Sequence, residues 1–387
     1  MNISKILHVI SSVDPKGGGP IEGVYQFSAV HQDMGVAVEI CSLDMPDAAC
    51  VSNSPIKVHA LGPVNGYYGY TRHLVPWLKA HAYEYDAVIV NGLWQYVGFA
   101  VWRALSGTAT PYYVFTHGML GPWFKYTYPL KHLKKWLYWP WAEYRVLRDA
   151  QGVLFTCDAE RLLARESFWL YKVNEEVSGF GISLPDANGH ELAGKFLAQY
   201  PQLQGKRIAL YLSRIHVIKG CDLLVEAFAK VARLDENLHL VMAGPDQIGW
   251  VPKLQALAEA LGIAHRITWP GMLQDEMKWG ALYAAEVFCL PSHHENFGVV
   301  VAEALACGKP VLISNKVNIW REIESDAAGF VDEDTVNGTV RNLQRWLALG
   351  ADSYADMCVH AQKCFATQFH IRRAAERLLE IIREYGR

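Results

Sequence analysis

The sequence predicts an α/β protein built from two doubly wound domains. Short apolar runs alternate with amphipathic helical stretches, and this alternation stops near residue 181 and then starts again. Strands that alternate with helices favour a parallel sheet covered by helices on both faces. The length of 387 residues is too great for one ordinary core and sufficient for two such domains.

The first half of the chain begins with a short apolar strand over Lys5–Ser11, followed by a glycine-rich turn and a helix that extends to about Met34. Further apolar runs, separated mostly by helical stretches, predict the remaining strands of this domain, which we expect to comprise residues 1–182. These strands are Val36–Leu43, Ile56–Leu61, Ala87–Val90, Tyr112–Thr116 and Gly152–Thr156.

The segment Ser183–Gly205 is polar and rich in Pro and Gly, which places a domain boundary near Gly181–Pro185. A second domain is expected over residues 183–366, and residues 367–387 are expected to form a charged amphipathic helix that crosses back to the first domain. The predicted strands of the second domain are Arg207–Leu212, Leu238–Ala243, Arg266–Trp269, Glu286–Pro291 and Pro310–Ser314, the last of which closes the series. Its predicted helices are Cys221–Leu234, Val251–Leu261 and Val299–Cys307.

The composition narrows the class of protein. With 51% hydrophobic and 19% charged residues the chain is globular, and its net charge of −3 gives no support to nucleic-acid binding. The eight cysteines form no CxxC pair and no His/Cys cluster, which favours reduced core thiols and gives no zinc signature. Because we find neither a signal peptide nor the roughly 18 apolar residues of a membrane span, we expect a cytoplasmic protein, with any membrane contact peripheral on the inner face.

Two glutamates follow the predicted strand that ends at Pro291. Glu295 lies in the loop, and Glu303 lies about a turn and a half into the helix that begins near Gly298. The backbone N–H groups of Asn296–Val299 form the N-terminus of this helix, which attracts a phosphate or a sugar oxygen. A carboxylate that accepts two hydroxyl hydrogen bonds suits the diols of a sugar or a ribose. The alternative is that Glu295 caps the helix and Glu303 is solvated.

Two cations lie in the loop after the first strand of the second domain. Arg214 and Lys219 are five residues apart, and Gly220 follows them directly. Both side chains can reach one diphosphate from such a loop and neutralise the charge of a departing nucleoside diphosphate. An ordinary exposed basic loop is the alternative.

Two further loops follow strands of the first domain. Gly17-Gly18-Gly19 lets the backbone approach a phosphate closely, although it matches neither GxGxxG nor a Walker loop and is a flexible turn on the simpler interpretation. His117 directly follows Thr116 at the end of a strand, where it can donate a hydrogen bond to a sugar hydroxyl or support developing charge. It can equally be a core histidine whose hydrogen bonds are satisfied.

Together these four features resemble the family 4 retaining glycosyltransferases, which have the GT-B fold of two Rossmann-like domains facing a central cleft. The resemblance covers essentially the whole chain and is strongest from Ile208 to Val331. Its most specific parts are the E-x7-E motif of Glu295 and Glu303, continued by the residues up to Val311, and the R-x4-K-G loop that ends at Gly220.

The resemblance implies a role for each motif residue. Arg214 and Lys219 are expected to hold the donor diphosphate, Glu295 the hydroxyls of the transferred sugar and Glu303 those of the ribose. Further donor contacts are implied for Gly18, Gly19, Gly244, Asn296, Phe297, Gly298 and Val299, and His117 is placed near the sugar. The chain departs from the family at Pro245-Asp246-Gln247, where a charged or glycine-rich continuation is usual. The resemblance therefore does not decide whether the donor nucleotide is UDP or GDP.

The implied mechanism is a front-face transfer in which the leaving diphosphate takes the acceptor proton. No residue stands out as a covalent nucleophile, and His117, Arg214, Lys219 and Glu295 are the expected catalytic groups. The nucleotide sugar is a substrate, so no cofactor is expected. No Asp-x-Asp motif lies in a suitable context, and hence no metal is expected either.

The segment Gly121–Arg148 interleaves basic residues with Trp and Tyr and carries only one acidic residue, Glu143. This composition suits a membrane interface, and the segment directly follows His117. The hypothesis is that it docks on anionic lipid and reaches a lipid-linked acceptor; the alternative is that its aromatic residues pack inside the domain. The residues assigned to this acceptor side are Trp123, Lys131, Lys134, Lys135 and Trp136.

The expected function is therefore retaining transfer of a hexose-type sugar from a nucleotide-diphosphate donor to an acceptor hydroxyl. A lipid-linked saccharide in cell-surface polysaccharide or glycolipid assembly is the expected acceptor. Three alternatives remain open: a sugar-nucleotide epimerase of the same architecture, a transferase acting on a soluble small acceptor, and a regulatory protein that binds the donor without turnover.

Overall fold

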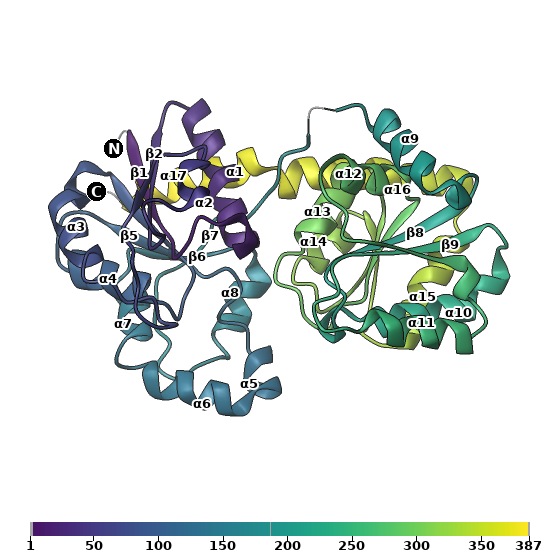
Figure 1. The fold of residues 1–387 in the computed structure, drawn as a ribbon, viewed down its shortest axis with the longest axis horizontal. Coiled ribbons are helices and arrows are strands. Elements are labelled where there is room, and N and C mark those ends of the chain that lie inside the picture. Colours follow the sequence, from purple (N-terminus) through teal and green to yellow (C-terminus); the bar gives the residue numbers. More distant parts are fainter. Residues whose placement is uncertain (1–2, 186, 386–387) are drawn as a thin grey trace. The chain divides into compact units, whose positions relative to one another are not determined.

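The computed structural model describes residues 3–185 and 187–385, which divide into two compact units (Figure 1). Unit 1 contains the chain up to Ile182 and again from His370 onward, and unit 2 is Ser183–Phe369. Each unit contains its own parallel sheet with helices on its faces. The predicted fold class, α/β with two doubly wound Rossmann-like domains, is confirmed.

The described residues of unit 1 form a seven-stranded parallel sheet in the order β3-β2-β1-β4-β5-β6-β7. The chain first builds outward from β1 through β2 and β3 and then continues on the other side from β4, so the topology switches between β1 and β4. Ligands of open α/β sheets bind at such a point, beyond the carboxyl ends of the strands. The strands are β1 (Lys5–Val9), β2 (Ala37–Ser42), β3 (Val58–Ala60), β4 (Ala87–Asn91), β5 (Tyr112–Phe115), β6 (Gly152–Phe155) and β7 (Glu175–Val177).

The helices of unit 1 cover both faces of its sheet. The last of them, α17, packs against α1, where His31 Nε2 lies 3.0 Å from the backbone oxygen of Ala375. Buried residues of α17 recur at helical spacing, from Ile371 through Leu378 to Ile382, which is why this charged helix docks on unit 1. The helices are α1 (Gly19–Asp33), α2 (Ala49–Ser52), α3 (Leu74–His81), α4 (Tyr96–Leu105), α5 (Trp123–Thr127), α6 (Pro129–Tyr138), α7 (Glu143–Arg148), α8 (Asp158–Ala164) and α17 (Ile371–Tyr385).

Unit 2 contains a six-stranded parallel sheet in the order β10-β9-β8-β11-β12-β13, with the switch between β8 and β11. Its strands are β8 (Arg207–Leu212), β9 (Leu238–Ala243), β10 (Ile267–Gly271), β11 (Val287–Leu290), β12 (Val311–Ser314) and β13 (Gly329–Asp332). Its helices are α9 (Gly189–Gln199), α10 (Cys221–Val231), α11 (Val251–Ala260), α12 (Asp275–Ala284), α13 (Val299–Ala306), α14 (Trp320–Ser325), α15 (Val336–Leu347) and α16 (Ala351–Cys364).

Besides helices α12, α14, α15 and α16, which were not predicted, three further elements differ from the sequence prediction. The boundary segment predicted as polar and irregular contains α9, whose apolar residues Leu192 and Phe196 are buried and whose first turn is capped by Asn188. The series of strands does not close at Ser314, because β13 follows at the edge of the sheet. Strand β7 at the edge of the other sheet was also missed. Its residues are only half-buried, so it lacks an apolar run.

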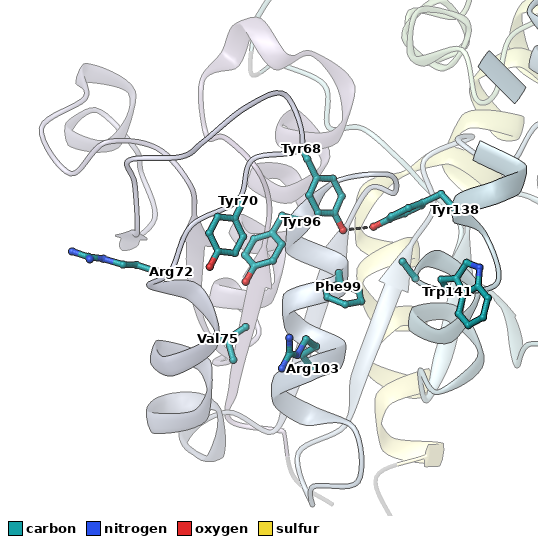
Figure 2. Close-up of a pocket in the computed structure, with 10 residues that line it drawn as sticks. Tyr68, Tyr70, Arg72, Val75, Tyr96, Phe99, Arg103, Tyr138 and Trp141 are labelled. Atoms are coloured by element: carbon teal, nitrogen blue, oxygen red, sulfur yellow. Dashed lines mark hydrogen bonds between the residues drawn. The ribbon is translucent and has the colours of Figure 1, made fainter. Parts of the chain in front are cut away.

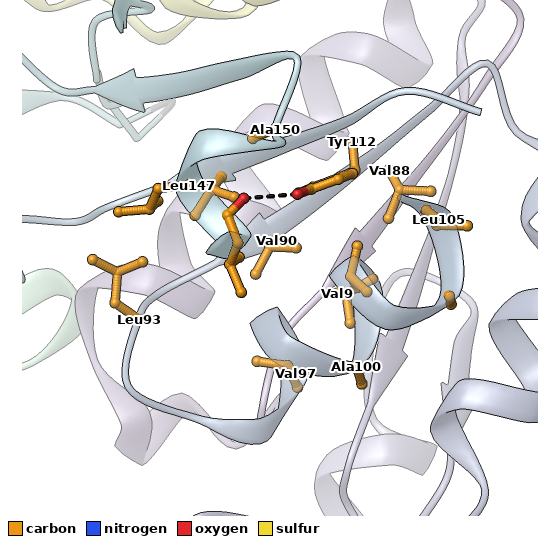
Figure 3. Packing of buried hydrophobic residues seen from close by; sticks show 14 of the residues in the cluster. Val9, Val88, Val90, Leu93, Val97, Ala100, Leu105, Tyr112, Leu147 and Ala150 are labelled. Carbon is orange, nitrogen blue, oxygen red and sulfur yellow. Dashed lines mark hydrogen bonds between the residues drawn. The ribbon is translucent and has the colours of Figure 1, made fainter. Parts of the chain in front are cut away.

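The core of unit 1 packs on the central strands of its sheet. Figure 3 shows Val9, Val88 and Val90 beside residues of α4 and α7 such as Val97 and Leu147, and all five side chains are fully buried. Central parallel strands are covered on both faces, which explains why the sequence shows continuous apolar runs there and not an alternation. These rigid strands fix the loops at their carboxyl ends.

The described part of the chain offers no helix that is both long enough and apolar enough to cross a bilayer.

Candidate functional site

Two of the four candidate catalytic residues, Lys219 and Glu295, meet at the topological switch point of unit 2. Lys219 follows β8 and Glu295 follows β11, and the Lys219 ammonium lies 2.5 Å from Glu295 Oε2. The Lys219 side chain is 7% exposed and that of Glu295 is 21% exposed. The ammonium has three N–H donors, so this ion pair leaves donors for an anionic ligand.

Hydrogen bonds between the loop after β8 and the loop after β11 hold Lys219 and Glu295 close together. The backbone oxygen of Ile218 accepts hydrogen bonds from Ser292 Oγ at 2.9 Å and from the backbone N–H of His293 at 2.8 Å. The ring of His216 accepts a hydrogen bond from the backbone N–H of Ile218, and this cap starts the short 3₁₀ turn that contains Lys219. Lys219 is therefore held on a rigid support, unlike a cation of an ordinary exposed basic loop.

Arg214 belongs to the same loop but is exposed, with one long contact of 3.4 Å to Gln247 Oε1. The loop is tied to the end of β9 through the backbone N–H of Ile215, which donates to Pro245 O at 3.0 Å. Gly244 makes this approach possible, because a Cβ at that position would lie 1.7 Å from Ser213 O and its φ is +143°. The structure thus brings Arg214 and the Gly244 loop together.

The loop from Glu295 to Gly298 forms the N-terminus of α13. Glu295 Oε1 accepts a hydrogen bond from the N–H of Asn296, and Gly298 is the residue before the first helical residue, Val299. The ring of Phe297 is buried and packs edge-to-face on Phe369 at 5.6 Å, so only the backbone of Phe297 is suited to contact a ligand. The alternative of Glu295 as a helix cap is wrong, because the N-cap of α13 is Gly298 with no side-chain cap, and the second oxygen of Glu295 accepts from Lys219.

Glu303 is buried, with 6% of its surface exposed, so it is not the solvated residue of the alternative interpretation. Its Oε1 accepts a hydrogen bond from the Lys278 ammonium of α12 at 2.8 Å. Lys278 was not among the residues selected from the sequence, because nothing in its helix distinguishes it from other solvated lysines.

In unit 1 the glycine-rich loop leads from β1 into α1. Asp14 accepts a hydrogen bond from the N–H of Lys16, and Gly18 then adopts a φ of +77° just before Gly19 begins the helix. A Cβ at Gly18 or Gly19 would meet no atom within 4 Å. The start of α1 is therefore open to an approaching anion.

His117 lies at the end of the neighbouring strand β5 in a left-handed conformation with φ of +47°. Its ring stacks on Phe115, and its Nε2 lies 3.3 Å from Asn91 Oδ1. The amide nitrogen of Asn91 faces Ile89 O and Nδ1 of His8, so its oxygen must face His117. This orientation assigns the proton to Nε2 and leaves Nδ1 as an acceptor, which differs from the expected donation to a sugar hydroxyl. Burial lowers the pKa of His117 to about 3, so the ring is neutral near pH 7.

Glu160 of α8 fixes the backbone around His117. Its buried carboxylate accepts hydrogen bonds from Thr116 Oγ1 at 2.6 Å and from the N–H of Gly118 at 2.5 Å. Its second oxygen accepts from the N–H and the hydroxyl of Thr156. Neither Glu160 nor Asn91 was predicted from the sequence. Asn91 carried a weak signal, since it is a polar residue directly after an apolar strand.

The segment assigned to the acceptor side presents an exposed apolar face on α6. Leu130, Leu133 and Leu137 are 82%, 54% and 60% exposed, and their spacing places them on one side of the helix. Trp136 is 40% exposed, and Lys131 and Lys134 are exposed. Lys135 instead lies 4.4 Å above the ring of Trp94, and Trp123 is half-buried. Part of the aromatic content is internal, because Trp139 is fully buried against Phe168.

Glu143 of α7 gives unit 1 a pH-dependent stability. Burial raises the pKa of Glu143 to about 7, although the N–H of Trp94 donates to its Oε1. An unfolded glutamate titrates near 4.5, so between pH 4.5 and 7 the unfolded chain releases the proton first and stability falls as pH rises. The total loss is about 3 kcal/mol above pH 7.

We therefore expect Glu143→Gln to be more stable than the wild type at pH 8 by up to about 3 kcal/mol and nearly equal to it at pH 4.5. Urea unfolding at a series of pH values measures the difference. A constant difference across this range would contradict the pKa of Glu143.

Comparison with known proteins identifies the family. The glycosyl transferases group 1 model matches residues 195–363, and the glycosyl transferase 4-like domain model matches residues 18–176. Alpha-D-kanosaminyltransferase of Streptomyces kanamyceticus is 25% identical over 248 residues, which are 64% of this chain and 64% of that enzyme.

Solved structures share the fold at low sequence identity. Anabaena HepE in complex with UDP superimposes with a TM-score of 0.77 at 18% identity, covering 98% of this chain and 100% of the other. WaaG, a glycosyltransferase involved in lipopolysaccharide biosynthesis, gives a TM-score of 0.66 at 17% identity, covering 97% and 99% of the two chains. Since both halves of the chain match models of one family and the fold agrees, the chain belongs to the group 1 glycosyl transferases, the family 4 enzymes of the GT-B fold.

Proposed function

We propose that this protein transfers a hexose-type sugar from a nucleotide-diphosphate donor to an acceptor hydroxyl with retention of configuration. The observation that carries the proposal is the buried Lys219–Glu295 pair at the switch point of unit 2. Membership of a transferase family supports the reaction class, and the switch point is where open α/β sheets bind nucleotides.

The chemistry follows from the charges at this point. As the bond between the anomeric carbon and the diphosphate breaks, its electron pair leaves with the diphosphate, where negative charge accumulates. Lys219, fixed by its loop, supplies preorganised positive charge, and Arg214, exposed in the same loop, adds a second cation. The acceptor hydroxyl bonds to the anomeric carbon on the same face, and a diphosphate oxygen takes its proton. Glu295 would hold hydroxyls of the sugar, Glu303 those of the ribose, and the neutral His117 would accept a hydrogen bond from the sugar.

UDP is the favoured nucleotide, because HepE binds UDP on the same fold. A thermal-shift panel of UDP, GDP and their sugar conjugates tests this assignment, since a ligand that binds only the folded state raises its stability. We expect UDP and one UDP-sugar to raise the Tm more than the GDP series. Absence of a shift with every nucleotide would contradict the proposed donor site.

An epimerase of the same architecture is separated from a transferase by incubating the protein with donor alone. An epimerase would convert the donor into an epimeric nucleotide sugar, in which the sugar is still linked to the nucleoside diphosphate. NMR of the donor detects this product. We expect no such conversion.

The acceptor is proposed to be a lipid-linked saccharide at a membrane surface, in polysaccharide or glycolipid assembly. The exposed leucines of α6, flanked by Lys131 and Lys134, suit the interface of an anionic bilayer. The shared fold with WaaG, which is involved in lipopolysaccharide biosynthesis, agrees with this proposal. The protein would then act at the cytoplasmic face of the membrane.

Liposome flotation tests the α6 surface. We expect the protein to float with vesicles that contain anionic lipid and the variant Leu133→Ser/Leu137→Ser to lose at least about 10-fold in partitioning, because each buried leucine contributes about 1.5 kcal/mol or more. Leu234→Ser, a matched exposed leucine of unit 2, should float like the wild type. Equal flotation of all three proteins would assign the apolar face another role.

A further inference from the structure

Unit 1 contains a concave site that shares no residue with the candidate donor-binding groups. A cavity of about 550 Å³ lies between the segment Tyr68–Arg72, helix α4 and the end of α6 (Figure 2). Its volume falls within the range of sites that hold small organic molecules. The residues used below are Tyr68, Tyr70, Tyr96, Arg103, Tyr138 and Trp141, all of which line it.

The aromatic walls of this cavity are fixed before any ligand arrives. The backbone N–H of Tyr96 donates to Tyr68 O at 2.8 Å, which ties the loop to the start of α4. The Tyr68 and Tyr138 hydroxyls share a hydrogen bond, drawn as a dashed line in Figure 2. The rings of Tyr70 and Tyr96 meet edge-to-face at 5.0 Å. A preorganised wall lowers the entropy cost of binding.

Three polar groups of the cavity, the Arg103 guanidinium and the hydroxyls of Tyr70 and Tyr96, have no hydrogen-bond or ion-pair partner among the described residues. In Figure 2 the hydroxyls of Tyr70 and Tyr96 point toward the side where Arg103 projects from α4. Among residues 3–185 and 187–385, Arg103 forms no ion pair and neither hydroxyl forms a hydrogen bond, whereas Arg148 of α7 and Arg161 of α8 are paired with acidic side chains. Arg72, also without an acidic partner in the described residues, lies at the rim.

This set of donors fits an anion with several oxygens. A guanidinium presents a planar fork of N–H groups that matches phosphate, and two phenol hydroxyls can donate to its remaining oxygens. Trp141 also lines the cavity and lies near Tyr138 in Figure 2, on the other side from Arg103. It is 70% exposed and offers an aromatic face to a flat apolar surface such as one side of a sugar ring. Among the described residues that line the cavity, none is acidic.

We propose that this cavity binds a phosphate ester of a sugar or polyol, with the phosphate on Arg103, Tyr70 and Tyr96 and the organic part extending along the aromatic wall toward Trp141. The proposal goes beyond the proposed function, because it concerns neither the donor nor the reacting atoms. The same chemistry can come from a free sugar phosphate or from the phosphorylated head group of a lipid. The second source is suggested by the exposed leucines of α6, the helix whose last residue, Tyr138, lines the cavity.

Calorimetric titration of the full chain with glucose 1-phosphate, inorganic phosphate and glucose tests the site. We expect glucose 1-phosphate to bind more tightly than either fragment. Arg103→Gln should weaken it by roughly 10- to 100-fold, the factor that a hydrogen bond from a charged group contributes. Arg383→Gln makes the same change of charge on an exposed part of α17 and should leave binding unchanged. Tyr70→Phe/Tyr96→Phe, which keeps the rings, should weaken binding if the hydroxyls donate.

Two further measurements show whether the phosphate binds in this cavity or at the donor site, and whether it comes from a free sugar phosphate or a lipid head group. If Lys219→Ala still binds glucose 1-phosphate and Arg103→Gln does not, the phosphate binds in this cavity. If Arg103→Gln still binds it and Lys219→Ala does not, glucose 1-phosphate binds at the donor site and the proposal is wrong. In the lipid arm, flotation with phosphatidylglycerol vesicles is compared with phosphatidylcholine vesicles. Loss of flotation in Arg103→Gln without glucose 1-phosphate binding to the wild type identifies the lipid head group as the source. If Arg103→Gln changes neither assay, the proposal is wrong.

Discussion

Lys219→Ala is expected to lower the turnover of sugar transfer by about 10²- to 10³-fold, the loss seen when one preorganised charge-stabilising group is removed from an active site. The ammonium is buried and its loop is pinned through Ile218, so its positive charge is already in place when the diphosphate begins to leave. Neither solvent nor a neighbouring side chain can supply that charge at the same position without reorganisation. Release of the nucleoside diphosphate in the presence of acceptor measures the effect.

The matched control for this experiment is Lys253→Ala, which removes an exposed lysine of α11 in the same unit. It should retain wild-type turnover. Removal of Lys219 also leaves the Glu295 carboxylate without its cation, so the Tm of the variant should be compared with that of the wild type. A folded Lys219→Ala protein with near-normal turnover would refute the proposed role.

The sequence was sufficient to predict the fold class, because central parallel strands leave continuous apolar runs and helices leave a period of 3.6 residues. Edge strands follow neither pattern. Strand β7 has the sequence Glu-Glu-Val and is half-buried, and β13 mixes glycine, apolar residues and aspartate. Both are strands because a neighbouring strand offers them hydrogen bonds, which is tertiary information that a local pattern does not contain.

The candidate site also contains residues that a sequence pattern identifies and residues that only the tertiary structure identifies. Arg214, Lys219, Glu295 and Glu303 lie in motifs with fixed spacing, so the sequence indicates them. The residues that hold such groups in place are scattered: Lys278 is 25 positions from its partner Glu303. The proton of His117 also depends on a distant residue, since the Asn91 amide is oriented by Ile89 and His8. Residues that act through such partners have no sequence signature of their own.

Glu160→Ala is expected to cost unit 1 about 3–5 kcal/mol of stability, a large part of the 5–15 kcal/mol that a typical domain has. Both oxygens of this buried carboxylate accept two hydrogen bonds each, from Thr116, Gly118 and Thr156. Without it, the N–H groups of Gly118 and Thr156 are left buried and unpaired, and each unsatisfied group costs about 1–3 kcal/mol.

The same substitution should reduce transfer even at a temperature where the variant remains folded. His117 lies between the two residues that Glu160 holds, in a left-handed conformation that costs a non-glycine residue about 1–3 kcal/mol and persists only when its surroundings enforce it. Release of that constraint lets the ring leave its stack on Phe115 and its contact with Asn91. Glu166→Ala removes an exposed glutamate just beyond α8 and should change stability by less than about 0.5 kcal/mol. Urea unfolding and turnover are measured on all three proteins, and a Glu160→Ala variant as stable as Glu166→Ala would show that the strained turn does not depend on this carboxylate.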